Sequence, residues 1–247
     1  MRRPSAFTLV ELLIVVAIVA VLLGLLVPAM AHARAEGRRI VCMSNLQQLA
    51  LGTHMYLDDN KGAFWRYHRN VPGGRRWWFG YEVGGPGSGT DRPLDKEQGV
   101  LADYIQSTDD GLQCPTFPYH NALFYPKFAE RSASYGYNLN LGPVPTSLAT
   151  AQRSTYLGRA ATVVVFADAV HFDFGPTFNE GHYINYTANA ATPSGYAHFR
   201  HLDQTQMIML DGHIRRQRLD GPSFRQVARA ESGNLTAEDG SSDIYGK

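Results

Sequence analysis

Hydrophobic and polar positions divide the N-terminal quarter of the chain into two stretches. Residues 7–31 are almost entirely apolar and contain one charged side chain, that of Glu11. Residues 12–31 carry no charge, and about twenty helical residues at about 1.5 Å each span the roughly 30 Å hydrocarbon core of a bilayer. The pattern therefore predicts a transmembrane helix segment over residues 7–31.

The second stretch, residues 32–62, is amphipathic. Its apolar positions recur at helical spacings of four and three residues, at Cys42, Leu46, Leu49, Thr53 and Tyr56. Residues 58–62, Asp-Asp-Asn-Lys-Gly, favour a helix end because glycine suits the left-handed position after a last turn. We expect one helix over residues 7–57, kinked at Pro28 because proline removes a backbone hydrogen bond.

Strand-like patterns follow in the second half of the chain. Residues 134–139 are rich in tyrosine, and residues 162–167, Thr-Val-Val-Val-Phe-Ala, are typical of a buried central strand. Residues 205–210 and 213–219 flank Asp211-Gly212, a pair that favours a hairpin turn with positive φ at both residues. We expect an antiparallel sheet packed on the helix. The last strand carries three arginines that would protect an exposed edge, Arg215, Arg216 and Arg218.

Two stretches show no clear periodic pattern of apolar and polar residues. Residues 71–93 are rich in Gly and Pro, which predicts a long loop. We expect its aromatic side chains to pack against the domain and so pin the loop onto it. The alternative is that they form an exposed contact surface. These residues are Trp77, Trp78, Phe79 and Tyr81. Residues 221–247 are polar and are predicted to form a loosely held tail.

Composition limits the remaining function classes. The chain has 247 residues, of which 44% are hydrophobic and 18% charged, enough for the helix and one globular domain over residues 63–220. The formal net charge is +1, and no basic cluster alternates with aromatic residues on a periodic element. Nucleic-acid binding is therefore not supported.

Glu11 is the most informative residue of the apolar stretch. A carboxylate in hydrocarbon costs roughly 2.5–3.5 kcal/mol on insertion scales, so it needs a cationic partner. A cut between Ala6 and Phe7 would create an α-amine four residues before Glu11. The amine of one copy could then neutralise the carboxylate of its neighbour.

The segment Phe7-Thr8-Leu9-Val10-Glu11, behind a short basic leader at residues 1–6, resembles the signal of type IV pilins and type II secretion pseudopilins. The resemblance implies cleavage by a prepilin peptidase, N-methylation of Phe7 and a role for Glu11 in filament assembly with other subunits. It also implies a single pass through the bacterial inner membrane with the N-terminus cytoplasmic, which flanking charges alone do not decide. One departure is Ala6, where the family usually has Gly.

An ordinary secretory signal is the alternative. The basic start, the apolar run and Ala29-Met30-Ala31 fit a signal that would be cut after Ala31. The apolar run is longer than a usual signal core of 7–15 residues and contains Glu11, and both features favour the retained helix.

The second half carries a further resemblance, to a pilin-like family of unknown function with a His-x9-Asp-Gly signature. His201, Asp211 and Gly212 fit that spacing. Supporting fragments occur in the order expected of that family; they are Cys42 with residues 44–49, Cys114-Pro115, residues 134–138 and residues 167–169. The resemblance implies no biochemical activity.

Metal and cysteine chemistry remain open. Asp168, His201 and Asp211 offer ligands for a divalent metal if the fold brings them together, with His171, His198 and His213 as neighbours. Turn formation alone also explains Asp211. By analogy with type II pseudopilins, such an ion would be a structural calcium, and no cofactor is otherwise expected. Cys42 and Cys114 would lie outside the cytoplasm and form a disulfide or remain two buried thiols.

The sequence therefore predicts an α+β, pilin-like fold, with a long N-terminal helix packed on an antiparallel sheet domain. The expected function is that of a structural filament subunit and not of an enzyme. The alternatives are a helix-anchored envelope protein that binds a ligand, or a secreted metal-dependent hydrolase.

Overall fold

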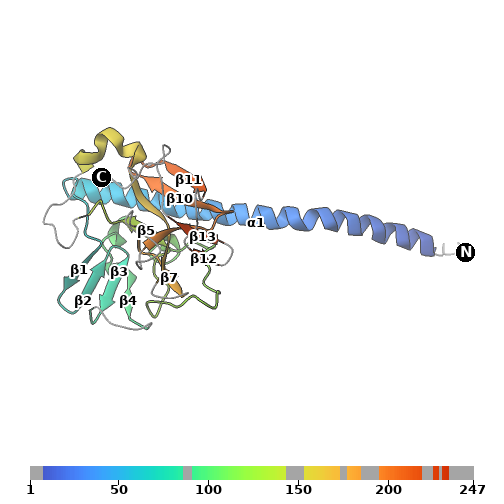
Figure 1. Ribbon diagram of the computed structural model, residues 1–247, viewed down its shortest axis with the longest axis horizontal. Coiled ribbons are helices and arrows are strands. Elements are labelled where there is room, and N and C mark those ends of the chain that lie inside the picture. The colour runs from blue at the N-terminus through green and yellow to red at the C-terminus, as the bar shows by residue number, and fades with distance from the viewer. Residues whose placement is uncertain are drawn as a thin grey trace, which may run out of the picture.

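The computed structural model describes residues 8–85, 91–142, 153–172, 177–184, 195–218, 225–227 and 230–233. One long helix, α1 (Leu9–Asp59), runs out of a domain built mainly of β-strands, and its N-terminal half projects away from that domain (Figure 1). This is the predicted α+β, pilin-like architecture. The leader and both residues of the expected cleavage junction, Ala6 and Phe7, lie outside the described residues.

The second half of α1 packs on the domain along the predicted stripe. Its buried residues are Cys42, Asn45, Leu46, Leu49, Ala50, Gly52, Thr53 and Leu57. The helix ends where the sequence indicated, because Lys61 and Gly62 take φ values of 56° and 77° and the Gly62 N–H donates to Leu57 O at 2.6 Å. Helical assignment is continuous through Pro28, and the kink stays a prediction.

The larger sheet supplies the surface on which α1 packs. Its strands run in the order β11-β10-β6-β9-β13-β12, and β5, β7 and β8 lie beside this path. Among the described strands, β5 and β8 pair in parallel and the other pairs are antiparallel. The bounds are β5 (Tyr135–Asn138), β6 (Val164–Phe172), β7 (Phe178–Glu180), β8 (Tyr183–Ile184), β9 (Gly195–Phe199), β10 (Gln204–Met209), β11 (Ile214–Arg218), β12 (Arg225–Val227) and β13 (Ala230–Gly233).

The prediction of a long loop over residues 71–93 is wrong. This region contributes to a second antiparallel sheet of β1 (His68–Val71), β2 (Gly74–Trp77), β3 (Gly80–Val83) and β4 (Leu94–Asp95). The glycines that indicated a loop instead permit close strand contact, since a Cβ on Gly74 would lie 2.2 Å from Glu82 O. The interpretation that the aromatic side chains pin this region is confirmed for Trp77, Trp78 and Phe79, which are buried.

Three short 3-10 helices, η1 to η3, lie between the two sheets in the chain, and a fourth, η4, lies between β5 and β6. Aromatic side chains fill the space between the sheets and α1. Trp65 stacks on Tyr137 with ring centroids 4.8 Å apart, and Trp78 lies 4.9 Å from Phe166. This cluster also contains the buried stripe of α1. The short helices are η1 (Lys96–Gln98), η2 (Ala102–Tyr104), η3 (Asp110–Leu112) and η4 (Arg153–Thr162).

The predicted hairpin of β10 and β11 is confirmed, but its turn is of another kind. Only Gly212 has positive φ, at 91°, and its N–H donates to Met209 O at 2.9 Å. A turn with positive φ at both residues occurs instead at Leu202 and Asp203, between β9 and β10. The arginines of β11 lie on a strand at the sheet edge, as expected.

The prediction of a loosely held tail over residues 221–247 is wrong for two segments. β12 and β13 fall within residues 221–247, and β13 pairs with β9 along Glu231, Ser232 and Gly233. The free N–H and C=O groups on the outer edge of β9 explain this pairing, because an open strand edge accepts another strand of almost any sequence. Other parts of the predicted tail lie outside the described residues.

Replacing Gly212 with Val should lower the free energy of unfolding by more than about 1 kcal/mol, because a β-branched residue at φ 91° is strained. The cost is backbone strain alone, since nothing lies within 4 Å of a Cβ there. Urea denaturation of the full chain in neutral detergent measures it. Asp211→Asn is the matched control and should change stability by under about 0.5 kcal/mol, since this residue is exposed. Equal stability of Gly212→Val and wild type would contradict the assigned turn.

Candidate functional site

The N-terminal half of α1 exposes its apolar side chains on all sides. Leu13 is 66% exposed and Leu25 71% exposed, and the first buried residue of the helix is Cys42. The helix is long and apolar enough to cross a membrane. Leu9 to Val27 are therefore placed to contact lipid or other helices, because no described part of the chain covers them.

Thr8 and Glu11 form a capping box at the start of this helix. The Thr8 N–H and hydroxyl donate to Glu11 Oε2 at 2.8 and 2.7 Å, and the Glu11 N–H donates to Thr8 Oγ1 at 3.3 Å. Glu11 Oε1 accepts no hydrogen bond from a described residue. The carboxylate is thus held by its own helix with one oxygen available. The Thr-x-x-Glu spacing could have revealed this box, and our reading of the sequence missed it.

The second candidate site surrounds a buried disulfide. Cys42 and Cys114 are bridged, with Cα atoms 5.3 Å apart, which ties the loop before Pro115 to α1. The imidazole of His201 lies against this bridge, with Nε2 3.4 Å from Cys114 Sγ and Nδ1 3.3 Å from Thr116 Oγ1. His201 of the His-x9-Asp-Gly spacing is therefore a buried neighbour of the disulfide.

Asp168 connects His201 to the centre of the sheet. It lies inside β6 and not at its end, and its Oδ2 accepts from the Gln206 N–H at 2.8 Å. Arg200 Nε lies 3.4 Å from Oδ1, and His201 Nε2 lies 3.3 Å from Oδ2. Burial alone would raise the pKa of the Asp168 carboxyl, but Arg200, His201 and the Gln206 N–H together lower it below its ordinary value. The cluster therefore holds a paired, buried carboxylate.

The structure brings two of the three expected metal ligands together, Asp168 and His201, but not Asp211. Asp211 lies in the hairpin turn at the opposite end of β10 from His201, and its Oδ1 lies 2.6 Å from His213 Nδ1. Among the described residues, one group offers three ligand atoms within 4.8 Å, namely Cys42, Cys114 and His201. Its cysteines are in a disulfide, and metals bind the thiolate, so the bridged form does not fit a metal.

A third polar cluster was not predicted. Ser132 Oγ donates to Glu180 Oε2 at 2.6 Å and lies 2.7 Å from His182 Nε2, and the Ser132 N–H donates to Glu180 Oε1 at 2.9 Å. In nucleophilic triads the histidine lies between the hydroxyl and the carboxylate, whereas here the hydroxyl lies between them. All three residues are buried, and the His182 ring stacks on Phe79 at 4.2 Å. The arrangement anchors β7 structurally and does not fit an activated serine.

The free energy of unfolding of the Glu180→Gln variant, measured relative to that of wild type, should increase as pH rises from about 5 to 8. Burial raises the pKa of Glu180 from 4.5 to about 7, so over that window the folded state holds a proton that the unfolded state releases. Wild-type stability from this group therefore falls as pH rises, by up to about 3 kcal/mol. His171 and His182, whose pKa values burial lowers, act oppositely in both proteins and cancel in the difference. Denaturation of both proteins at pH 5 and pH 8 tests this, and a pH-independent difference would contradict it.

A helix long and apolar enough to cross a membrane, capped at its first turn and packed through its second half on a domain built mainly of β-strands, gives the protein an α+β architecture of the pilin type. Residues 1–27 match the family model of the prokaryotic N-terminal methylation motif. No curated protein and no solved structure matches the chain. The motif and the helix together support a precursor of the type IV pilin or pseudopilin type, anchored in the inner membrane by one pass. The motif implies processing by a prepilin peptidase and assembly with other pilin subunits.

Proposed function

We propose that this protein is a structural subunit of a type II secretion or type IV pilus-like filament. The observation that carries the proposal is that the exposed apolar half of α1 lies within the residues that match the methylation motif. An apolar helix that no described part of its own chain covers is stable in lipid, or in a bundle of identical helices after it leaves the membrane. A structural and non-enzymatic role is in keeping with both features.

Assembly would use both halves of the helix. Phe7, freed and methylated by the peptidase, would supply the amine that neutralises Glu11 of a neighbour, through the oxygen that the capping box leaves available. Further along, the side of α1 that faces away from the domain keeps exposed apolar residues, at Ile40, Val41, Leu51 and Met55. These residues would extend the helix contacts beyond the membrane-spanning part.

The mature chain should begin at N-methylated Phe7, because the junction after Ala6 lies within the matched motif. Intact-mass analysis of membrane-extracted protein, with N-terminal sequencing, measures this. Replacing Phe7 with Pro, which removes the normal amide at the cut site, is the control and should leave the leader attached. A chain that starts at His32 would contradict the proposal and favour an ordinary secretory signal.

A further inference from the structure

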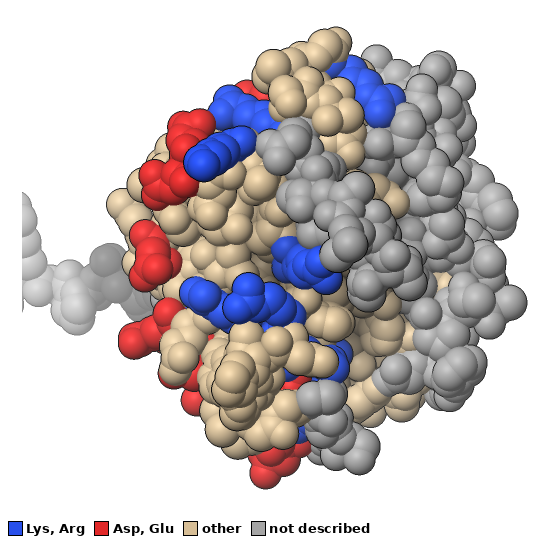
Figure 2. All heavy atoms as spheres, turned by 90° about the vertical axis from the view of Figure 1, so that its left-hand side faces the viewer, with Lys and Arg blue, Asp and Glu red and all other residues tan. Residues whose placement is uncertain are grey.

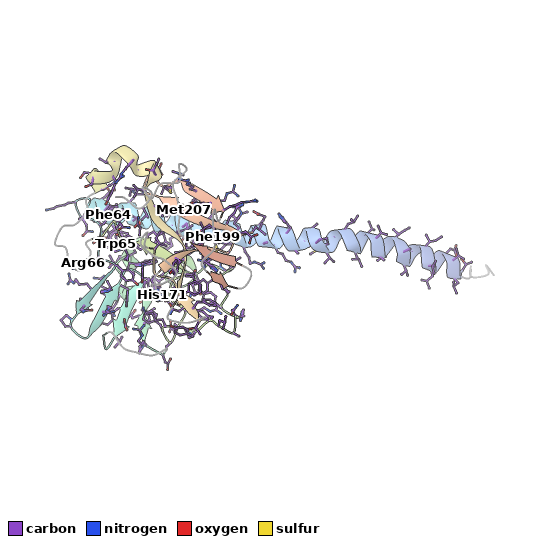
Figure 3. All side chains as sticks on the ribbon, in the orientation of Figure 1. Phe64, Trp65, Arg66, His171, Phe199 and Met207 are labelled. Atoms are coloured by element: carbon purple, nitrogen blue, oxygen red, sulfur yellow. A yellow bond between two sulfur atoms is a disulfide. The ribbon has the colours of Figure 1, made fainter. Side chains whose placement is uncertain are left out.

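A cavity of about 480 Å³ is lined by Phe64, Trp65 and Arg66, which lie at the end of the domain opposite the projecting helix (Figure 3). It is bounded by the last turn of α1, the segment that follows it, strands β1 and β2, and the short helix η2. Figure 2 shows Lys and Arg side chains gathered in the middle of this face, with Asp and Glu along one side. The cavity has no part in the proposed helix assembly, so a function for it goes beyond that proposal.

Three arginines line the cavity, and one carboxylate, Asp103, faces them. The side chains of Arg66 and Arg69 make no ion pair or hydrogen bond with the described residues, whereas the Arg76 guanidinium donates to the carbonyl oxygens of Gln98 and Gly99 at 2.9 and 3.2 Å. Those carbonyls fix the Arg76 guanidinium without neutralising its charge. The cavity therefore has a net positive charge, and guanidinium groups are the side chains that bind carboxylates and phosphates in a bidentate manner.

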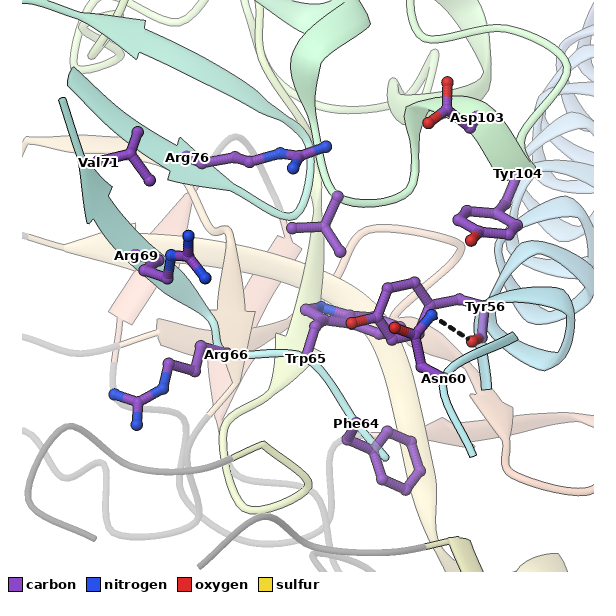
Figure 4. Close-up of a pocket in the computed structure, with 11 residues that line it drawn as sticks. Tyr56, Asn60, Phe64, Trp65, Arg66, Arg69, Val71, Arg76, Asp103 and Tyr104 are labelled. Carbon is purple, nitrogen blue, oxygen red and sulfur yellow. Dashed lines mark hydrogen bonds between the residues drawn. The ribbon is translucent and has the colours of Figure 1, made fainter. Parts of the chain in front are cut away.

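Aromatic rings form the opposite wall. The rings of Tyr56 and Tyr104 lie 5.6 Å apart, and Trp65 lies between these tyrosines and the arginines (Figure 4). Trp65 is 3% exposed, and its indole N–H has no acceptor among the described residues. A buried donor without an acceptor costs free energy, so a bound oxygen atom here would be favoured. Figure 3 places Phe64, Trp65 and Arg66 at the same end of the domain.

We propose that this cavity binds an acidic carbohydrate of the uronic-acid type. Arg66 and Arg69 would bind the carboxylate, the tyrosine rings would contact the apolar face of the sugar, and Asn60 and Asp103 would bind its hydroxyl groups. Asp103 favours a ligand that carries hydroxyl donors beside its anionic group, because a carboxylate only accepts hydrogen bonds and a phosphodiester offers no donor to it.

Full-length protein in neutral detergent micelles, titrated calorimetrically with an oligogalacturonate, tests the proposal. The double substitution Arg66→Gln with Arg69→Gln should weaken binding by roughly ten-fold or more, since charge-assisted hydrogen bonds are lost. The control Arg218→Gln removes an exposed arginine on the distant edge strand β11 and should leave affinity within about two-fold. A neutral oligogalactose should bind roughly ten-fold more weakly than the acidic oligomer.

Several outcomes would overturn the proposal. They are no binding of oligogalacturonate by wild type, equal weakening in the Arg218→Gln control, and equal binding of the neutral oligomer. Tighter binding of an oligothymidylate, or of inorganic phosphate, would assign the cavity to a phosphate ligand instead. Melting curves of each variant show whether it is folded. The Arg66→Lys variant, which keeps the charge, should bind oligogalacturonate more tightly than the double variant does. None of these measurements depends on filament assembly.

Discussion

Glu11→Val is expected to leave the protein in the membrane and to abolish its incorporation into filaments. The substitution removes a charge that costs roughly 2.5–3.5 kcal/mol in hydrocarbon, so membrane insertion becomes easier. It also removes the carboxylate that would pair with the Phe7 amine of a neighbour. Fractionation measures retention in the membrane, and sheared-filament yield measures assembly. Normal filaments from this variant would refute the pairing hypothesis.

Thr8→Ala separates pairing from capping. This variant loses the two cap hydrogen bonds made by the Thr8 hydroxyl, worth about 1 kcal/mol, but keeps the backbone N–H at residue 8 and the Glu11 carboxylate. If Glu11 acts through the amine of a neighbour, Thr8→Ala should still assemble while Glu11→Val should not. Equal loss of filaments in the two variants would show instead that the capping box itself is what assembly requires.

Replacing both Cys42 and Cys114 with Ala should lower the free energy of unfolding by roughly 4 kcal/mol. The bridge closes a separation of 72 residues, and chain-entropy arguments give about this magnitude for such a loop. The sulfur atoms are also buried, so their removal leaves a small cavity beside His201. Denaturation of wild type and the double variant, each with and without reductant, measures the loss.

Reductant should destabilise wild type and leave the double variant unchanged. A second arm adds Zn²⁺ to reduced wild type, because the free thiolates would then join His201 in a set of ligand types that zinc accepts. We expect the bridge, and not a metal, to account for native stability. Identical stability of oxidised wild type and double variant would contradict that expectation, and so would a chelator effect on the oxidised protein.

Some elements of the fold were predictable from the sequence, and the sheet of β1 to β4 was not. The helix, its buried stripe and its end at Asp59 were predictable because periodic burial and a left-handed glycine are local signals. The strands around residues 134–139 and 205–219 were predictable because tyrosine-rich composition and the Asp-Gly turn are also local signals. The sheet of β1 to β4 was not predictable, because the arginines of β2 and the glycines that begin β2 and β3 conceal the alternation of apolar and polar residues. These strands are ordered by their pairing with one another, which their composition does not show.

The sequence by itself determined the membrane-length helix, its methylation motif and the hairpin at Gly212, since each depends on neighbours within a few residues. Only the tertiary structure decided which distant side chains meet. It placed His201 against the Cys42–Cys114 bridge and Asp168, put Asp211 at the other end of β10, and gathered Arg66, Arg69 and Arg76 around one cavity. Such contacts depend on strand register and on the packing of the helix against the sheets, which local spacing does not encode.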